Sequence, residues 1–151
     1  MVSHIVIGAA LIVLTVVIHA LAMRSAFRVH GWAHSERWNL RAPWTITLLT
    51  AGFVLVMFLA AMLEALVWAW TYVAVGAFEA LEPAFYFSLV AFTTVGFGDV
   101  VLDPSWRVLS AIEAADGIML FGWTTALIFW FVQRQVQNTR KGDPMSEGEE
   151  R

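Results

Sequence analysis

Residues 83–99 read Pro-Ala-Phe-Tyr-Phe-Ser-Leu-Val-Ala-Phe-Thr-Thr-Val-Gly-Phe-Gly-Asp, and the interpretation of the whole chain starts from this segment. Pro83 suits the first position of a helix, because its missing N–H has no intrahelical partner there. A helix over 83–93 must end before Gly96 and Gly98, which alternate with bulky residues. The segment is too short to cross a bilayer and too apolar for an ordinary loop, so we expect a re-entrant element.

The alternating glycines of segment 94–99 have a physical meaning. Glycine accepts a positive φ, so a stretch in which every second residue lacks a Cβ can turn successive carbonyls the same way. Carbonyl oxygens that face one axis, repeated by several copies of the chain, form cages that replace the hydration shell of a monovalent cation. The negative end of the helix dipole favours a cation at the same place. The simpler alternative is a turn at a helix end, so the surroundings of the motif decide.

The composition of the whole chain indicates a membrane protein. Of its 151 residues, 60% are hydrophobic and 14% charged, and the mean hydropathy is +0.71, whereas a soluble domain has about 25% charged residues. This excludes a soluble enzyme, a nucleic-acid binder and a disordered regulator, and the lack of cysteine excludes disulfides and thiol chemistry. Apolar runs predict three spans: residues 5–23, an outer helix over about 44–78 and an inner helix over about 105–133.

The basic residues predict the orientation of these spans. Eight of the nine lie in a basic loop, residues 24–43, or in a polar tail, residues 134–151. The positive-inside bias places both segments in the cytoplasm, with the N-terminus and the opening of the re-entrant element outside. The alternative is a cleaved signal peptide over residues 1–23, which the lack of a basic residue before the apolar run disfavours.

Two sets of side chains are expected at the membrane surface. The basic loop 24–43 is expected to lie on anionic lipid. His19 is expected to be a packed or interfacial residue. Tryptophans favour the headgroup region, and the expected interface anchors are Trp32, Trp38, Trp44, Trp68 and Trp70.

Residues 93–99, Thr-Thr-Val-Gly-Phe-Gly-Asp, resemble the selectivity-filter signature of the potassium-channel superfamily. The resemblance covers about residues 45–134, and the span over 1–23 is extra to the two-span plan of the small bacterial members. It implies passive K⁺ conduction by a four-fold homotetramer in which each chain contributes one re-entrant loop. The third span is similar to the inner helix of those channels at Gly117-Ile118, Phe121-Gly122, Thr125-Ala126 and Trp130-Phe131-Val132.

The resemblance also implies roles for individual residues. Filter carbonyls would coordinate K⁺, and they belong to Thr94, Val95, Gly96 and Phe97. The Thr94 hydroxyl would close the innermost site, Gly98 would support the filter, and Asp99 would concentrate cations at the outer mouth. Gly117 resembles the inner-helix hinge. The cavity-facing positions would be Ile118, Phe121, Thr125 and Phe129.

The filter departs from the family pattern at two positions. The common tyrosine is Phe97, and the pore-helix tryptophan that bonds it in many relatives is Phe87, so donor and acceptor are both absent. We expect a hydrogen bond between Tyr86 and Asp99 to act as the brace instead. The resulting hypothesis is a filter that inactivates more readily than a tyrosine-braced one.

Three acids, Glu64, Glu113 and Asp116, lie in the apolar spans without a Lys or Arg to pair with them. Intramembrane acids are costly and usually functional. Glu113 and Asp116 share one helix face, and that face differs from the cavity-facing one. Either the acids tie the spans to the pore helix by hydrogen bonds, or they make gating sensitive to pH.

The combined expectation is an all-α integral membrane protein with three transmembrane helices, a re-entrant pore helix over 83–93 and an extended filter over 94–99. The pore domain, residues 44–133, assembles as a homotetramer in a cell membrane, such as a bacterial inner membrane. No enzymatic cofactor and no nucleic acid is expected, only K⁺ in the filter and lipid around the protein. The alternatives are a cation channel of relaxed selectivity and a non-conducting subunit of another transporter or channel; an enzyme is the weakest reading.

Overall fold

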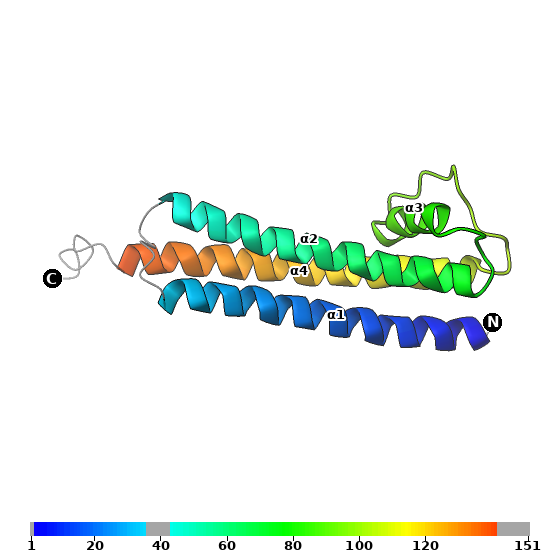
Figure 1. Ribbon diagram of the computed structural model, residues 1–151, viewed down its shortest axis with the longest axis horizontal. Coiled ribbons are helices and arrows are strands. Elements are labelled where there is room, and N and C mark those ends of the chain that lie inside the picture. Colours follow the sequence, from blue (N-terminus) through cyan, green and yellow to red (C-terminus); the bar gives the residue numbers. More distant parts are fainter. Residues whose placement is uncertain (1, 36–42, 142–151) are drawn as a thin grey trace.

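The computed structural model describes residues 2–35 and 43–141, which form four helices and, within those ranges, no strand. The helices are α1 (Val2–Ser35), α2 (Pro43–Ala74), α3 (Leu81–Phe92) and α4 (Arg107–Lys141). The three long helices lie side by side, and the short α3 packs at one end of the bundle (Figure 1). The amino end of α1 lies at the same end as α3, and α4 leads away to the opposite end (Figure 1).

The three long helices are long and apolar enough to cross a membrane. Their candidate spans are Val2–Arg28, Trp44–Ala74 and Arg107–Arg134. At 1.5 Å per residue each exceeds the hydrocarbon core of about 30 Å. The apolar α3 has only 12 residues and cannot cross. The chain is therefore an all-helical, multi-pass membrane protein with one short helix that enters and leaves at the same end, as the sequence predicts.

Several helix ends differ from the sequence expectation, and α4 continues past residue 133 to Lys141, so the first part of the expected polar tail is helical. α1 does not stop at residue 23 but continues to Ser35, because Arg24 and Arg28 are good helix formers and no proline intervenes. The first part of the expected basic loop is thus helical. α2 ends at Ala74 rather than near Phe78. Gly76 adopts φ +76°, and the Ala77 N–H donates to Tyr72 O at 2.8 Å, which is a glycine-dependent helix termination.

α1 packs on α2 and α4 through one narrow seam. Its buried residues recur every three to seven positions, at Gly8, Leu11, Thr15, His19 and Ala26. A Cβ at Gly8 would lie 2.8 Å from Ile112 Cγ2, so the glycine permits close contact with α4. Ile7, Ile12 and Val16 are partly buried beside this seam, whereas the apolar side chains on the opposite face of α1, such as Val13 and Val17, are exposed as lipid-facing residues are. The helix is thus an integral part of the bundle.

The tryptophan prediction is wrong for Trp68, whereas the exposure of Trp44 and Trp70 is compatible with it. Trp44 and Trp70 are 59% and 57% exposed, which fits interface anchors. Trp68 is fully buried, because its indole N–H donates to Asp116 inside the bundle. The Trp32 and Trp38 side chains lie outside the part of the structure that is described.

Candidate functional site

α3 is set into the bundle by one apolar face. Its buried residues are Ala84, Phe87, Ser88 and Phe92. The helix begins at Leu81, so Pro83 is its third residue, still within the first turn, where backbone N–H groups have no intrahelical partner. The Thr93 N–H caps the other end by donating to Leu89 O at 3.1 Å. The segment 94–99 therefore starts at the carboxyl end of α3, where that helix is packed against the bundle.

The backbone of segment 94–99 alternates in handedness. Thr94, Gly96 and Gly98 have φ values of +60°, +57° and +77°. The glycines satisfy this geometry without cost, whereas a β-branched threonine in the left-handed region is strained by about 1–3 kcal/mol. The sequence analysis anticipated the two glycines but not Thr94, since nothing in the identity of a threonine signals a positive φ. Every second residue is thus turned the same way.

The hydrogen bonds of this segment leave its carbonyls available. The N–H groups of Val95 and Gly96 both donate to Val90 O, at 3.1 and 3.3 Å, and hold the start of the segment against the end of α3. Across residues 2–35 and 43–141, no hydrogen bond ends on the carbonyl oxygens of residues 94–97. These are the oxygens that the family resemblance assigns to K⁺.

The same segment exposes large apolar side chains in the single chain. Val95 is 53% exposed and Phe97 is 70% exposed. The expected cavity-facing positions on α4 are exposed as well, namely Ile118, Phe121, Thr125 and Phe129. The Phe121 ring meets the Phe92 ring edge-on at 5.7 Å, so this face of α4 begins beneath the end of α3.

Gly117 serves a contact that the sequence analysis did not foresee. A Cβ at this position would lie 1.9 Å from Phe92 O, so the backbones of α3 and α4 cross here almost in contact. α4 runs through Gly117 as one uninterrupted helix. In this structure the residue is required by packing, whereas the resemblance implied a hinge.

The outer end of the segment is braced as predicted. The Tyr86 hydroxyl donates to Asp99 Oδ2 at 2.6 Å. This hydrogen bond is the main cause that holds the pKa of Asp99 below its ordinary value. Phe87 makes no polar contact of its own and packs edge-on against Tyr72, with ring centroids 5.5 Å apart.

Glu113 joins three helices behind the segment. Its Oε2 accepts a hydrogen bond from the Tyr72 hydroxyl of α2 at 2.6 Å, and its Oε1 contacts the Ser88 hydroxyl of α3. Ser88 also donates to Ala65 O at 2.7 Å. Glu113 and Ser88 are fully buried. One turn along both helices, Gly117 meets Phe92, so α3 and α4 are held in register at two successive turns.

Asp116 and Glu64 instead attach α1 to the pore domain. Asp116 Oδ2 accepts hydrogen bonds from the Thr15 hydroxyl at 2.8 Å and from Trp68 Nε1 at 3.1 Å. Glu64 Oε1 lies 3.0 Å from His19 Nδ1, and its buried Oε2 has no hydrogen-bond partner among the residues that the structure describes. The acids do connect helices, but only Glu113 reaches α3.

His19 is the functional candidate that the sequence analysis undervalued. Its Nε2 lies 3.2 Å from Thr124 Oγ1 of α4, and its ring packs against Trp123 at 5.1 Å. The residue is 1% exposed and links all three long helices. A usable signal was present in the sequence, because His19 is the one imidazole inside an apolar span and a natural partner for an intramembrane acid.

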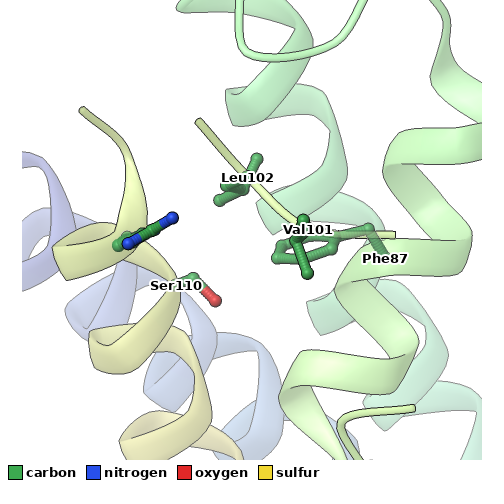
Figure 2. A pocket seen from close by; sticks show the side chains of 5 residues that line it. Phe87, Val101, Leu102 and Ser110 are labelled. Atoms are coloured by element: carbon green, nitrogen blue, oxygen red, sulfur yellow. The ribbon is translucent and has the colours of Figure 1, made fainter. Parts of the chain in front are cut away.

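A cavity of about 320 Å³ lies between α3, α4 and the chain after residue 99. Its lining combines apolar residues, Phe87, Val101 and Leu102, with the polar side chains of Arg107 and Ser110, and Figure 2 labels all of these except Arg107. No group of three or more His, Cys, Asp or Glu side chains in the described ranges could hold a metal ion. A cation bound in this region would rely on main-chain oxygen.

Comparison with known proteins agrees with this architecture. No curated protein and no solved structure matches the chain. The family described as "Ion channel" matches residues 44–134, more than half of the chain. The matched range holds α2, α3, the alternating segment and the apolar part of α4, and it leaves out α1. The chain belongs to this ion-channel family and is a membrane-spanning member with a short re-entrant helix between its last two spans.

Proposed function

We propose that the protein is a K⁺-selective channel that conducts passively through a homotetrameric pore. The observation that carries the proposal is the positive φ at Thr94, Gly96 and Gly98 together with carbonyls 94–97 that accept no hydrogen bond in the described residues. Four such segments around one axis present stacked rings of oxygen that replace the water around a dehydrated K⁺.

Two further features support four-fold assembly. Val95 and Phe97 expose more than half of their side chains in the single chain, and Ile118 and Phe129 do so along α4. Large apolar patches of this kind mark contact surfaces or membrane-facing surfaces. In the proposed tetramer, neighbouring chains cover the filter side chains, and the α4 face lines the cavity below.

The chemistry of conduction follows from the filter and its surroundings. The carboxyl end of α3 places partial negative charge beneath the filter, and the Thr94 hydroxyl closes the innermost site. Asp99 lies at the outer mouth as a carboxylate and raises the local concentration of cations. The basic residues of segments 24–43 and 134–151 support an orientation with that mouth outside the cell and the carboxyl end of α4 in the cytoplasm.

The test is a planar-bilayer recording of the purified protein with K⁺ on one side and Na⁺ on the other. The proposal requires a large reversal potential with the K⁺ side negative, and four chains per particle in native mass spectrometry. A reversal potential near zero would indicate relaxed cation selectivity. Absence of current and of liposome flux would indicate a non-conducting subunit.

A matched pair of variants separates the filter from general damage. A Cβ at Gly96 meets no atom within 4 Å, so Gly96→Ala disturbs the positive φ without a clash. We expect this variant to fold, assemble and lose selective current. Val13→Ala, on the exposed face of α1, is expected to conduct like the parent protein.

A further inference from the structure

A groove between α1 and α2 lies away from the proposed pore. It encloses about 410 Å³, within the range of about 300–1,000 Å³ of small-molecule sites. Its lining combines small residues with exposed leucines, namely Leu21, Leu59 and Leu63 at 58%, 56% and 48% exposure. The full lining is Ile18, Leu21, Ala22, Ser25, Val56, Leu59, Ala60 and Leu63.

The lining of this groove selects an apolar occupant. Ser25 is its one polar side chain, and the Ser25 hydroxyl donates to Ala22 O at 2.7 Å within its own helix. No free donor faces the groove, so water there would lack the two to four partners that an ordered water needs. A hydrocarbon chain fits this surface.

One end of the groove is basic and open. Arg28 follows Ser25 by three residues and therefore lies on the same side of α1, and both Arg24 and Arg28 are exposed. The Phe27 and Phe53 rings lie 5.7 Å apart, which sets this turn of α1 level with Gly52 of α2. A Cβ at Gly52 would meet nothing within 4 Å, so no side chain closes the groove on the way to Arg28.

We propose that this groove binds one acyl chain of an anionic phospholipid, with the lipid phosphate held by Arg24 and Arg28. From Ile18, which lines the groove, to Arg28 beyond its end, α1 rises about 15 Å, half of a hydrocarbon core of about 30 Å. This stretch therefore matches one leaflet. Basic residues at a membrane surface attract anionic headgroups. Two arginines are therefore expected to make the groove bind an anionic lipid roughly thirty-fold more tightly than a zwitterionic one.

One wall of the groove and both arginines belong to α1, and the other wall belongs to α2. α1 lies outside the residues that match the ion-channel family, and the proposal does not depend on K⁺ selectivity. It gives the additional span a role as one wall of a lipid site. It also makes the expected lipid contact of the basic loop 24–43 specific, because it assigns that contact to Arg24, Arg28 and this groove.

The test is native mass spectrometry of the whole protein released from detergent with equal amounts of phosphatidylglycerol and phosphatidylcholine of the same acyl chains. The parent protein is expected to retain phosphatidylglycerol at least tenfold better. The double variant Arg24→Gln/Arg28→Gln should retain both lipids equally. Arg134→Gln is the matched control, since the Arg134 guanidinium lies over the Trp130 ring at 5.2 Å, and it should retain the preference.

Filling the groove tests the acyl chain separately. Ala22→Leu narrows the groove, and Gly52→Leu blocks the path to Arg28 at a position with open space around it. Both variants should lose retained lipid of either headgroup while remaining folded. Unchanged phosphatidylglycerol retention in the arginine double variant, or unchanged retention in both groove variants, would overturn the proposal.

Discussion

At the scale of single residues, glycine is used in this protein for two different reasons. Gly96 and Gly98 supply positive φ in a segment where a Cβ would meet no neighbour. Gly117 has an ordinary helical backbone, and its need is steric, because α3 crosses α4 at that point. The same residue type thus serves backbone conformation in one place and close packing in the other.

The steric need at Gly117 leads to a stability prediction. Gly117→Ala places a Cβ 1.9 Å from Phe92 O, a backbone atom that cannot move aside, so we expect a loss of about 3 kcal/mol or more in the free energy of unfolding. Gly122→Ala, on the same helix with nothing within 4 Å, should be neutral or stabilise by up to about 1 kcal/mol. Unfolding in mixed micelles measures the free energy of unfolding of both variants. Equal losses in the two would contradict the close contact between α3 and α4 at Gly117.

The brace between Tyr86 and Asp99 leads to a pH prediction. Because this hydrogen bond lowers the pKa of Asp99, the parent protein keeps its outer carboxylate charged as the pH falls. Tyr86→Phe removes the main lowering cause, so the carboxylate is protonated at a higher pH. Single-channel conductance at low ionic strength should therefore begin to fall at a higher pH in the variant.

A neighbouring acid provides the control for this experiment. The pKa of Asp103 is also lowered, in its case by hydrogen bonds from Ser105. Ser105→Ala changes that acid and leaves Asp99 alone, so it should leave the pH profile in place. A Tyr86→Phe profile that coincides with that of the parent would show that Asp99 does not control the mouth.

At the scale of helices, buried carboxyl groups connect neighbouring helices through hydrogen bonds. Glu113 ties α4 to α3 and α2, while Asp116 and Glu64 tie α1 to the rest. A polar contact inside a membrane is selective, because an unmatched partner remains unsatisfied in hydrocarbon. The three acids therefore fix the register of helices whose apolar surfaces alone would slide.

The contacts of Glu113 indicate that it is a neutral acid. The Ser88 hydroxyl has a single hydrogen and two acceptors in reach, Ala65 O and Glu113 Oε1. All the contacts form together when Glu113 donates to Ser88 while Ser88 donates to Ala65 O. Glu113→Gln can reproduce this pattern with its amide, so we expect it to change the free energy of unfolding by less than about 1 kcal/mol.

Glu113→Leu is the contrasting variant. It leaves the Tyr72 hydroxyl without its acceptor, at a cost of about 1–3 kcal/mol, and removes the hydrogen bond between Glu113 and Ser88, whose hydroxyl keeps Ala65 O as its acceptor. Filter function should suffer as well, because Ser88 holds α3. If Glu113→Gln is as damaging as Glu113→Leu in the same unfolding assay, the side chain is ionised in the folded protein.

The attachment of α1 is tested by a double-mutant cycle. His19→Ala removes the one side chain that partners Glu64 in the described residues and leaves a buried carboxyl group unmatched, at a cost of about 3–5 kcal/mol. Adding Glu64→Leu removes the unmatched group, so the double variant should be more stable than His19→Ala alone. Additive losses would mean that the two side chains do not interact.

At the scale of the whole molecule, the network around His19 reaches the proposed pore. His19 contacts Thr124, and the adjacent Thr125 lies on the exposed face of α4. A change of hydrogen bonding in this buried layer therefore alters a contact of α4, the helix that carries the proposed cavity-facing residues. We expect Glu64→Gln or Asp116→Asn to change how the open probability depends on pH, without changing K⁺/Na⁺ selectivity.

Bilayer recordings across the acid range measure this effect. Thr50→Ala is a suitable control, because the Thr50 hydroxyl donates to Ile46 O of its own helix at 2.9 Å and joins no other helix. Identical gating curves for the parent and both acid variants would reduce these acids to a purely structural role.

The family and the order of helices followed from sequence because they depend on local properties. Apolar length defines a span, a proline and two glycines bound the re-entrant helix and its segment, and the motif at residues 93–99 is specific. The Tyr86–Asp99 contact was predictable for the same reason, since few side chains near the mouth offer a donor and an acceptor.

The pairing of buried groups came only from the folded bundle. Which helix each acid faces, the partnership of His19 with Glu64, the burial of Trp68 and the crossing at Gly117 all join residues at least 25 positions apart. Apolar periodicity states that a helix face is buried but not which neighbour covers it, because hydrocarbon contacts are nearly interchangeable. The choice of neighbour is decided by the match of shape and of hydrogen-bonding groups between whole helices. That match exists only once the helices have packed.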